Sequence, residues 1–195
     1  MRQGWLLGPT CLFVVMASAM GPRLARAQGV DVPVPLQASL LVKAAAFDYG
    51  LKQRGGDVVH VLVVEKAAIA DSHRVATQMK AALEGQTNIA GMPYDVTAMT
   101  YDGPAVLATA CHDQHIGIAY LSSGFTRDEI QALAVALDGA DVLTVAAVAA
   151  DVPEGIVLGF GLASGRPQLL ANLAQARRQN VSLAAGLLSL AKVYR

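Results

Sequence analysis

Residues 155–173 read GIVLGFGLASGRPQLLANL, and the rest of the chain can be interpreted around them. Two short apolar runs, 155–162 and 168–173, flank the turn residues Ser164-Gly165-Arg166-Pro167. Glycine between two such runs indicates a hairpin, because it supplies the positive φ that tight turns require. We therefore expect two antiparallel strands. A hairpin cannot bury its apolar faces alone, so the rest of the chain must provide partners for both.

The chain beyond Asn172 is expected to end on an amphipathic helix. Its apolar residues recur at helical spacing, with Ser182 placed to cap the run: Leu183, Leu187, Leu188, Ala191 and Tyr194. This stripe is predicted to be core, with Leu187 and Leu188 anchoring the helix on the sheet. Arg177 and Arg178 lie on the preceding polar turn and are predicted to stay outside, since buried arginines need carboxylate partners.

Upstream of the hairpin, apolar runs typical of strands alternate with helical patterns. A helical face over residues 36–51 is stopped by Gly55-Gly56, and the β-branched run 57–64 follows as a strand buried on both faces. Further strands are expected at 94–99, 116–121 and 142–148, and helices at 73–83, 104–110 and 128–137. This alternation predicts an α/β fold, a mainly parallel sheet with helices on both faces and the antiparallel hairpin plus helix at the C-terminus.

One helix start and the domain count follow from local signals. Thr126 and Glu129 form a capping box, in which each side chain bonds the backbone N–H of the other residue. No repeat, low-complexity tract or Pro/Ser-rich linker divides residues 28–195. We therefore expect one domain over this range.

The first 27 residues have the pattern of a secretory signal peptide. Arg2 precedes the apolar run 5–19, and the small residues Ala25 and Ala27 favour cleavage between Ala27 and Gln28. A membrane anchor is the alternative, but Gly8 and Pro9 interrupt the run, which is shorter than the ~20 residues a span needs. The mature chain is expected to be soluble and exported.

Charge and cysteine content exclude several functions. Cleavage removes three of the 15 basic residues, which leaves 12 against 15 acidic ones and a net charge of −3. Without a basic stripe, nucleic acid is not an expected partner. Only Cys111 remains, so any disulfide must be intermolecular and packing must hold the fold.

No motif in the sequence predicts catalysis or a metal site. Residues 111–115, Cys-His-Asp-Gln-His, are potential zinc or copper ligands, but their spacing suits a polar helix-to-strand connection better than a metal cage. A G-x-S-x-G elbow, a P-loop and a dinucleotide fingerprint are all missing. We therefore expect no enzyme activity, no metal and no cofactor.

The loops at the carboxyl ends of the strands are the place to look for a ligand site. Asp102 follows one strand, and Ser122-Ser123-Gly124 follows another at the start of the Thr126 helix. Exposed N–H groups and the helix dipole there favour an anion. The alternative is an ordinary strand-to-helix turn whose hydroxyls bond their own backbone.

The C-terminal motifs resemble those of the YfiR-like (YfiR/HmsC-like) family of exported bacterial proteins. That family typically shows a G…GF strand, a GKP or GRP turn, an Asn that opens a short helix and an LLKLAK finish. The matching residues here are Gly155-Ile156-Val157-Leu158-Gly159-Phe160, Gly165-Arg166-Pro167, Asn172-Leu173, Ala176-Arg177, Val181 and 187–193. Upstream, Val142-Leu143-Thr144-Val145, Leu41-Val42-Lys43 and Phe47-Asp48-Tyr49 are also similar, but residues 48–56 depart from the aromatic NF…WP end that many members carry.

The resemblance implies a periplasmic regulator without catalysis, with a fold close to one lobe of a periplasmic solute-binding protein. Its best-known relatives restrain a membrane-bound diguanylate cyclase by binding the periplasmic sensor domain, so cyclic di-GMP would be the readout. The candidate binding residues are Asp102, Ser122, Ser123, Gly124 and Arg177. A solute-binding protein that captures a small ligand at the strand ends is the alternative class, and an enzyme is a weaker third. A small-molecule effector and a homodimer remain open.

Overall fold

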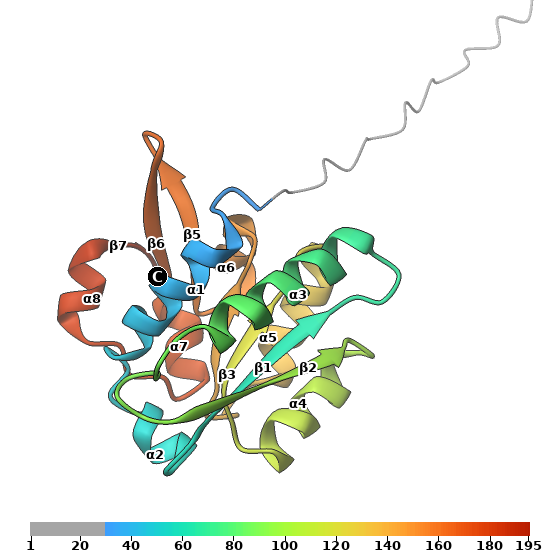
Figure 1. Ribbon diagram of the computed structural model, residues 1–195, viewed down its shortest axis with the longest axis horizontal. Coiled ribbons are helices and arrows are strands. Elements are labelled where there is room, and N and C mark those ends of the chain that lie inside the picture. Colours follow the sequence, from blue (N-terminus) through green and yellow to red (C-terminus); the bar gives the residue numbers. More distant parts are fainter. Residues whose placement is uncertain (1–29) are drawn as a thin grey trace, which may run out of the picture.

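A single seven-stranded sheet forms the centre of the protein in the computed structural model, which describes residues 30–195 (Figure 1). The strand order is β2-β1-β3-β4-β5-β6-β7. The bounds are β1 Val59–Glu65, β2 Tyr94–Thr100, β3 Ile116–Leu121, β4 Leu143–Ala146, β5 Leu158–Ala163, β6 Arg166–Asn172 and β7 Ala191–Tyr194. Strands β1 to β5 are parallel, β6 is antiparallel to β5, and β7 is parallel to β6. The predicted mainly parallel sheet and its hairpin are confirmed. The predicted cleavage site at Ala27 and Gln28 lies outside the described residues.

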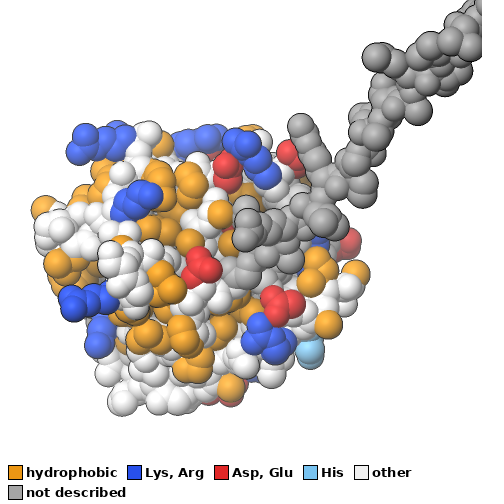
Figure 2. Space-filling view, turned by 90° about the horizontal axis from the view of Figure 1, so that it is seen from above, with side chains coloured by type: hydrophobic (Ala, Val, Ile, Leu, Met, Phe, Trp, Pro, Cys, Tyr) orange, Lys and Arg blue, Asp and Glu red, His pale blue; other side chains and the backbone are white. Residues whose placement is uncertain are grey.

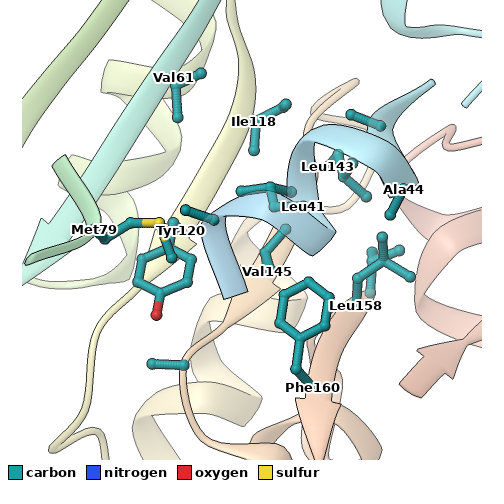
Figure 3. Close-up of a cluster of buried hydrophobic side chains, with 14 of the residues drawn as sticks. Leu41, Ala44, Val61, Met79, Ile118, Tyr120, Leu143, Val145, Leu158 and Phe160 are labelled. Carbon is teal, nitrogen blue, oxygen red and sulfur yellow. The ribbon is translucent and has the colours of Figure 1, made fainter. Parts of the chain in front are cut away.

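Helices cover both faces of the sheet. Their bounds are α1 Val34–Ala45, α2 Leu51–Gly55, α3 Ala70–Glu84, α4 Pro104–Asp113, α5 Arg127–Ala136, a 3₁₀ turn η1 Ala149–Asp151, α6 Val152–Gly155, α7 Leu173–Arg178 and α8 Ala185–Leu190. Leu41 of α1 and Met79 of α3 pack with Tyr120 and Phe160 of the sheet (Figure 3). The opposite face is covered by α4, α5 and α6, whose buried apolar side chains form a second cluster with the sheet.

The run that was predicted to be buried on both faces is β1. Val61 and Val63 belong to the first cluster, and Leu62 and Val64 to the second. Because successive side chains of a strand point to opposite faces, an unbroken apolar run needs a helix layer on each side. The capping box at Thr126 and Glu129 is also confirmed, and α5 begins at Arg127.

The first helix was predicted as one element over 36–51, and this was wrong. The chain leaves the helix after Ala45 and starts α2 at Leu51. Asp48 forms the corner: its carboxylate accepts from Gly50 N at 3.0 Å and pairs with the Arg54 guanidinium, and its backbone makes an antiparallel bridge with Leu183. Neither member of this buried pair reaches solvent appreciably, with side-chain exposures of 0% for Asp48 and 7% for Arg54.

The prediction of a helix to the end of the chain was wrong after Leu190. Residues Ala191–Tyr194 form β7, which pairs with β6. Ala191 packs toward the first core cluster and Tyr194 toward the second, so the two residues lie on opposite faces rather than on one helical stripe. The backbone groups at the edge of β6 gain partners this way, and tertiary context outweighs local propensity.

The hairpin turn is shorter than predicted. The connection is Ser164-Gly165, with φ of 51° and 76°, and Arg166 and Pro167 already belong to β6. Positive φ at both central residues is the pattern of a type I′ turn, whose twist matches that of the two strands. Gly155, expected at the start of β5, instead ends α6.

A buried glutamine fastens α1 to the sheet. Gln37 donates to Val32 O at 2.9 Å and to Ala147 O at 3.1 Å, and Tyr120 donates to Gln37 Oε1 at 2.9 Å. Both Gln37 and Tyr120 are fully buried. We expect Tyr120→Phe to lower the free energy of unfolding by about 1–3 kcal/mol, because it leaves a buried acceptor without a donor. A urea melt measures this, with the exposed Tyr49→Phe as control. Equal midpoints for the two variants would contradict it.

Candidate functional site

The loops at the carboxyl ends of β1 and β3 meet through three buried or partly buried groups. Ser122 follows β3, and its hydroxyl lies 2.6 Å from that of Ser72 on α3. Ser72 in turn accepts from Lys66 N at 2.8 Å, and Ser122 N donates to Val64 O at 3.0 Å. These bonds tie the two strand ends to the start of α3, so the Ser122 hydroxyl is already engaged within the protein.

Ser123 is bound in the same way. Its hydroxyl donates to Asp71 Oδ2 at 2.6 Å, and Asp71 also forms an ion pair with Arg74. The bond from Ser123, and then those from Arg74, hold the pKa of Asp71 below its usual value. The candidate anion loop therefore faces a carboxylate, which disfavours a second negative charge.

Gly124 has a structural reason to be glycine. Its φ is 94°, and a Cβ there would lie 2.7 Å from Ile69 Cδ1. The left-handed conformation and the contact both exclude an ordinary side chain. The alternative for this loop was a turn whose hydroxyls bond their own backbone, whereas the hydroxyls of Ser122 and Ser123 bond side chains of α3.

An ionic and aromatic cluster lies beside this loop. Lys66 binds both carboxylate oxygens of Glu129 at 2.6 and 2.8 Å and lies 5.7 Å from the ring centre of Phe125, which contacts Tyr101 edge-on. Burial opposes ionisation of Glu129, but the hydrogen bonds from Lys66 and Thr126 together outweigh it and lower its pKa. The cluster closes the gap between the ends of β1, β2 and β3.

Of the other two candidate residues, Asp102 lies at the same carboxyl-terminal edge of the sheet as the serine loop and Arg177 lies at the opposite edge. Asp102 is exposed after β2 and makes no side-chain hydrogen bond or ion pair with another residue of 30–195. Arg177 is exposed on α7, which follows the end of the antiparallel strand β6 and so lies at the opposite, amino-terminal edge of the parallel strands. The structure does not gather the five candidates into one site.

The loop after β4 carries a buried acid. Asp151 is only 6% exposed, and burial, followed by the nearby charge of Glu154, raises its pKa to about 7. An aspartate that is protonated in the folded state and ionised in the unfolded state binds more protons when folded. The stability that this group contributes is therefore full at low pH and is lost as pH rises toward 7.

We expect Asp151→Asn to flatten the dependence of stability on pH. In the parent protein the free energy of unfolding should fall between about pH 4 and pH 7, because unfolding releases the Asp151 proton. Urea melts at several pH values measure this slope for both proteins. Identical slopes would show that Asp151 is ionised in the folded protein.

A cleft at the amino-terminal edge was not predicted as a site. It has a volume of about 500 Å³, and its polar lining includes Gln53, Arg54, His112, His115, Asp141 and Asn180. Cys111 lines it too, but the residue is only 2% exposed and burial raises the pKa of its thiol to about 12. Within the described range, no group of three His, Cys, Asp or Glu side chains has metal-binding geometry. His115, Asp141 and Asn180 have positive φ: the first two lie just before β3 and β4, and Asn180 lies in the connection between α7 and α8.

Two solved structures share the fold. One is described as a conserved domain protein from Vibrio cholerae O1 biovar El Tor str. N16961 (TM-score 0.60, 14% identity, covering 85% of this chain and 61% of that one). The other is described as the ABC domain in complex with L-Trp from Streptococcus pneumonia (TM-score 0.57, 12% identity, 83% and 61%). This chain thus spans about three fifths of the length of either protein. At these identities the likeness shows the fold, which agrees with the predicted likeness to one lobe of a periplasmic solute-binding protein.

The sequence match is to a family. No curated protein matches this chain. Among the helices that the structure describes, none is long and apolar enough to cross a membrane. The family described as YfiR/HmsC-like matches residues 36–192, which is most of the sequence and includes the hairpin and both layers of helices. The chain therefore belongs to the YfiR/HmsC-like family.

Proposed function

We propose that this chain is a non-catalytic periplasmic regulator that binds and restrains the periplasmic sensor domain of a membrane signalling protein of the diguanylate-cyclase type. Family membership supports a regulatory role in the periplasm. Cyclic di-GMP is then the cellular readout. The apolar first 27 residues, with their small residues before Gln28, supply the export signal that this location needs.

The observation that carries the proposal is that the hydroxyl groups of the candidate ligand loop are already hydrogen-bonded to other side chains of the protein. The hydroxyls of Ser122 and Ser123 are bound to Ser72 and Asp71, and the Lys66 ammonium is bound to Glu129. A small ligand at these strand ends would have to break contacts between charged and buried groups to gain its own. Binding of a protein surface requires no such opening.

Capture of a small solute is the competing function. The Streptococcus pneumonia structure is described as a complex with L-Trp, and solute-binding proteins hold ligands in a concave pocket. This chain spans only 61% of that protein, so it would supply one wall of such a pocket. Calorimetry with L-tryptophan and other amino acids distinguishes the two functions. Saturable binding at micromolar concentration would favour the solute-binding function.

The decisive experiment tests the cellular readout and the partner together. In the host bacterium, loss of this gene should raise the intracellular concentration of cyclic di-GMP. Expression of the full-length exported chain should return that concentration to its original level. Tagged mature chain, mixed with solubilised inner membranes, should retain a diguanylate cyclase with a periplasmic domain. Unchanged cyclic di-GMP after deletion would refute the proposal.

Arg177 is the candidate partner contact that can be tested most simply. It is exposed, with no carboxylate partner within residues 30–195, so Arg177→Ala should leave the urea midpoint unchanged. If Arg177 contacts the sensor domain, the variant should raise the Kd by up to about tenfold. Arg127→Ala, another exposed arginine but on α5, is the control for binding. A loss of stability in Arg177→Ala would reveal a structural role instead.

A further inference from the structure

The charges of the mature chain are divided along its length. Residues 28–154 hold seven basic and fifteen acidic side chains, a net charge of −8. Residues 155–195 hold five basic side chains and no acidic one, a net charge of +5. Within residues 30–195, only Arg178 of these five pairs with a carboxylate of the first part, which leaves four basic side chains for a charged partner.

Most basic residues of the range 28–154 form an ion pair with a carboxylate of the same protein. Arg54, Lys66, Arg74, Lys80 and Arg127 each pair with a carboxylate, as does Arg178. The basic residues that form no ion pair within residues 30–195 are all exposed, and they are Lys43, Lys52, Arg166, Arg177, Lys192 and Arg195. Two belong to α1 and α2, and four follow residue 154.

Large exposed apolar side chains are concentrated in the same parts of the chain. Of the seven within the described range, five lie on α1, the corner after it, the hairpin and α8: Leu36, Phe47, Tyr49, Leu162 and Leu190. Tyr49 and Leu190 are each 74% exposed. The other two, Val106 and Val135, lie on α4 and α5.

The corner after α1 and the start of α8 are joined directly. Tyr49 N donates to Ser182 O at 3.0 Å, and Ala184 N donates to Phe47 O at 2.8 Å. A Cβ on Gly186 would lie 3.8 Å from the Phe47 ring, and Leu190 follows Gly186 by one helical turn. Segments that are far apart in sequence thus lie side by side (Figure 1). We call Phe47, Tyr49 and Leu190, with Lys43 and Lys52 close by in sequence to the two aromatic residues, the α1–α8 surface.

The charges decide which occupant this surface fits. In a two-fold dimer the same patch meets itself, so each unpaired lysine would face others of its kind, which costs free energy. A membrane-binding element needs a longer amphipathic helix than α8, which has six residues. The surface instead combines an aromatic and aliphatic centre with a basic rim, the anatomy of a site for a folded protein. Figure 2 shows hydrophobic and basic side chains together on the side away from the grey residues.

We propose that the α1–α8 surface docks an acidic face of a folded protein domain. The inference rests on the proposed function for the identity of that domain, the periplasmic sensor of a membrane diguanylate cyclase. The lysines accelerate encounter and disfavour a dimer through this surface, and Phe47, Tyr49 and Leu190 fill apolar depressions in the partner.

Site-specific photocrosslinking in the host bacterium tests the location. A benzophenone amino acid at Tyr49 or Leu190 of the full-length exported chain should give adducts to one acidic protein domain, identified by mass spectrometry. The same probe at Val135, which is 64% exposed on α5, is the matched control and should give none of this adduct. Adducts from Val135 alone, adducts of twice the chain mass, or adducts to lipid would each overturn the inference.

A charge reversal tests the chemistry. Lys43→Glu should raise the Kd for the crosslinked domain roughly fivefold or more at low salt, with most of the change in the association rate. Lys80→Glu, on the exposed face of α3, reverses the same charge outside the surface and should change the Kd less than twofold. Equal effects of the two variants would refute the electrostatic part of the inference.

The outcomes separate this inference from the proposed function. An adduct to an acidic domain that is not part of a diguanylate cyclase keeps the docking surface and refutes the proposed partner. Restored cyclic di-GMP control by a Lys43→Glu, Tyr49→Ala, Leu190→Ala variant keeps the regulatory function and refutes the docking surface. Periplasmic levels of each variant, measured by immunoblot, ensure that a loss of control is not a loss of protein.

Discussion

Asp48→Ala is expected to lower the free energy of unfolding by about 3–5 kcal/mol, because it leaves the Arg54 guanidinium buried without its counter-charge. Arg54 Nε already has no hydrogen-bond partner, so the carboxylate supplies the pairing that the buried group depends on. The Gly50 N–H would lose its acceptor as well. A shift of the urea midpoint at unchanged m-value measures the loss.

Two further variants isolate the cause. Asp48→Leu combined with Arg54→Met removes both charges and should recover most of the stability, since a buried pair can often be replaced by apolar residues. Asp138→Ala breaks a second two-pronged arginine–aspartate pair, the one with Arg178, and should change the midpoint little because that pair is solvated. If Asp48→Ala behaved like Asp138→Ala, solvent would reach the corner after α1.

This corner marks the limit of prediction from the sequence. The strand at 57–64, the antiparallel pairing of the hairpin and the capping box follow from local sequence patterns and were predicted correctly, although the hairpin turn is shorter than predicted. The break after Ala45 depends on the bridge between Asp48 and Leu183, which are far apart in the chain. The periodicity of nearby residues carries no information about such a distant contact. The predicted helix was therefore continued through the corner to residue 51.

The prediction of a helix at the end of the chain was wrong for a different reason. Ala191 and Tyr194 are three residues apart, which fits a helical stripe and equally fits opposite faces of a strand. The choice is made by the open edge of β6, whose register pairs Leu169 with Ala191 and Asn172 with Tyr194. A sequence pattern that is compatible with two structures is decided by what lies next to it in space.

One motif glycine gains a physical explanation only from the fold. Gly159 pairs with Ala146 of β4, and a Cβ there would collide with the buried Val152 of α6. The glycine before Phe160 thus lets α6 lie close against the sheet.

The position of the candidate site could be predicted from the sequence, but the hydrogen bonds that already occupy its hydroxyl groups could not. Strand-end loops can be placed from the alternation of elements, and Ser122 and Ser123 do lie at one such edge. That their hydroxyls would be bound by Ser72 and Asp71 of the neighbouring helix depends on packing across 50 or more residues. The division of charge at residue 154 is visible in the sequence, but the α1–α8 surface joins residues from both sides of it and can be recognised only in the fold.

Leu187→Ala is expected to lower the free energy of unfolding by about 2–5 kcal/mol, because Leu187 is 4% exposed and packs in the first core cluster. Leu190 provides a control in the same helix: it is 74% exposed, so Leu190→Ala removes the same atoms with little cost to stability. Urea melts of both variants measure the difference. A neutral Leu187→Ala would mean that α8 is not docked, and the α1–α8 surface would then lose the support that holds Leu190 beside Phe47.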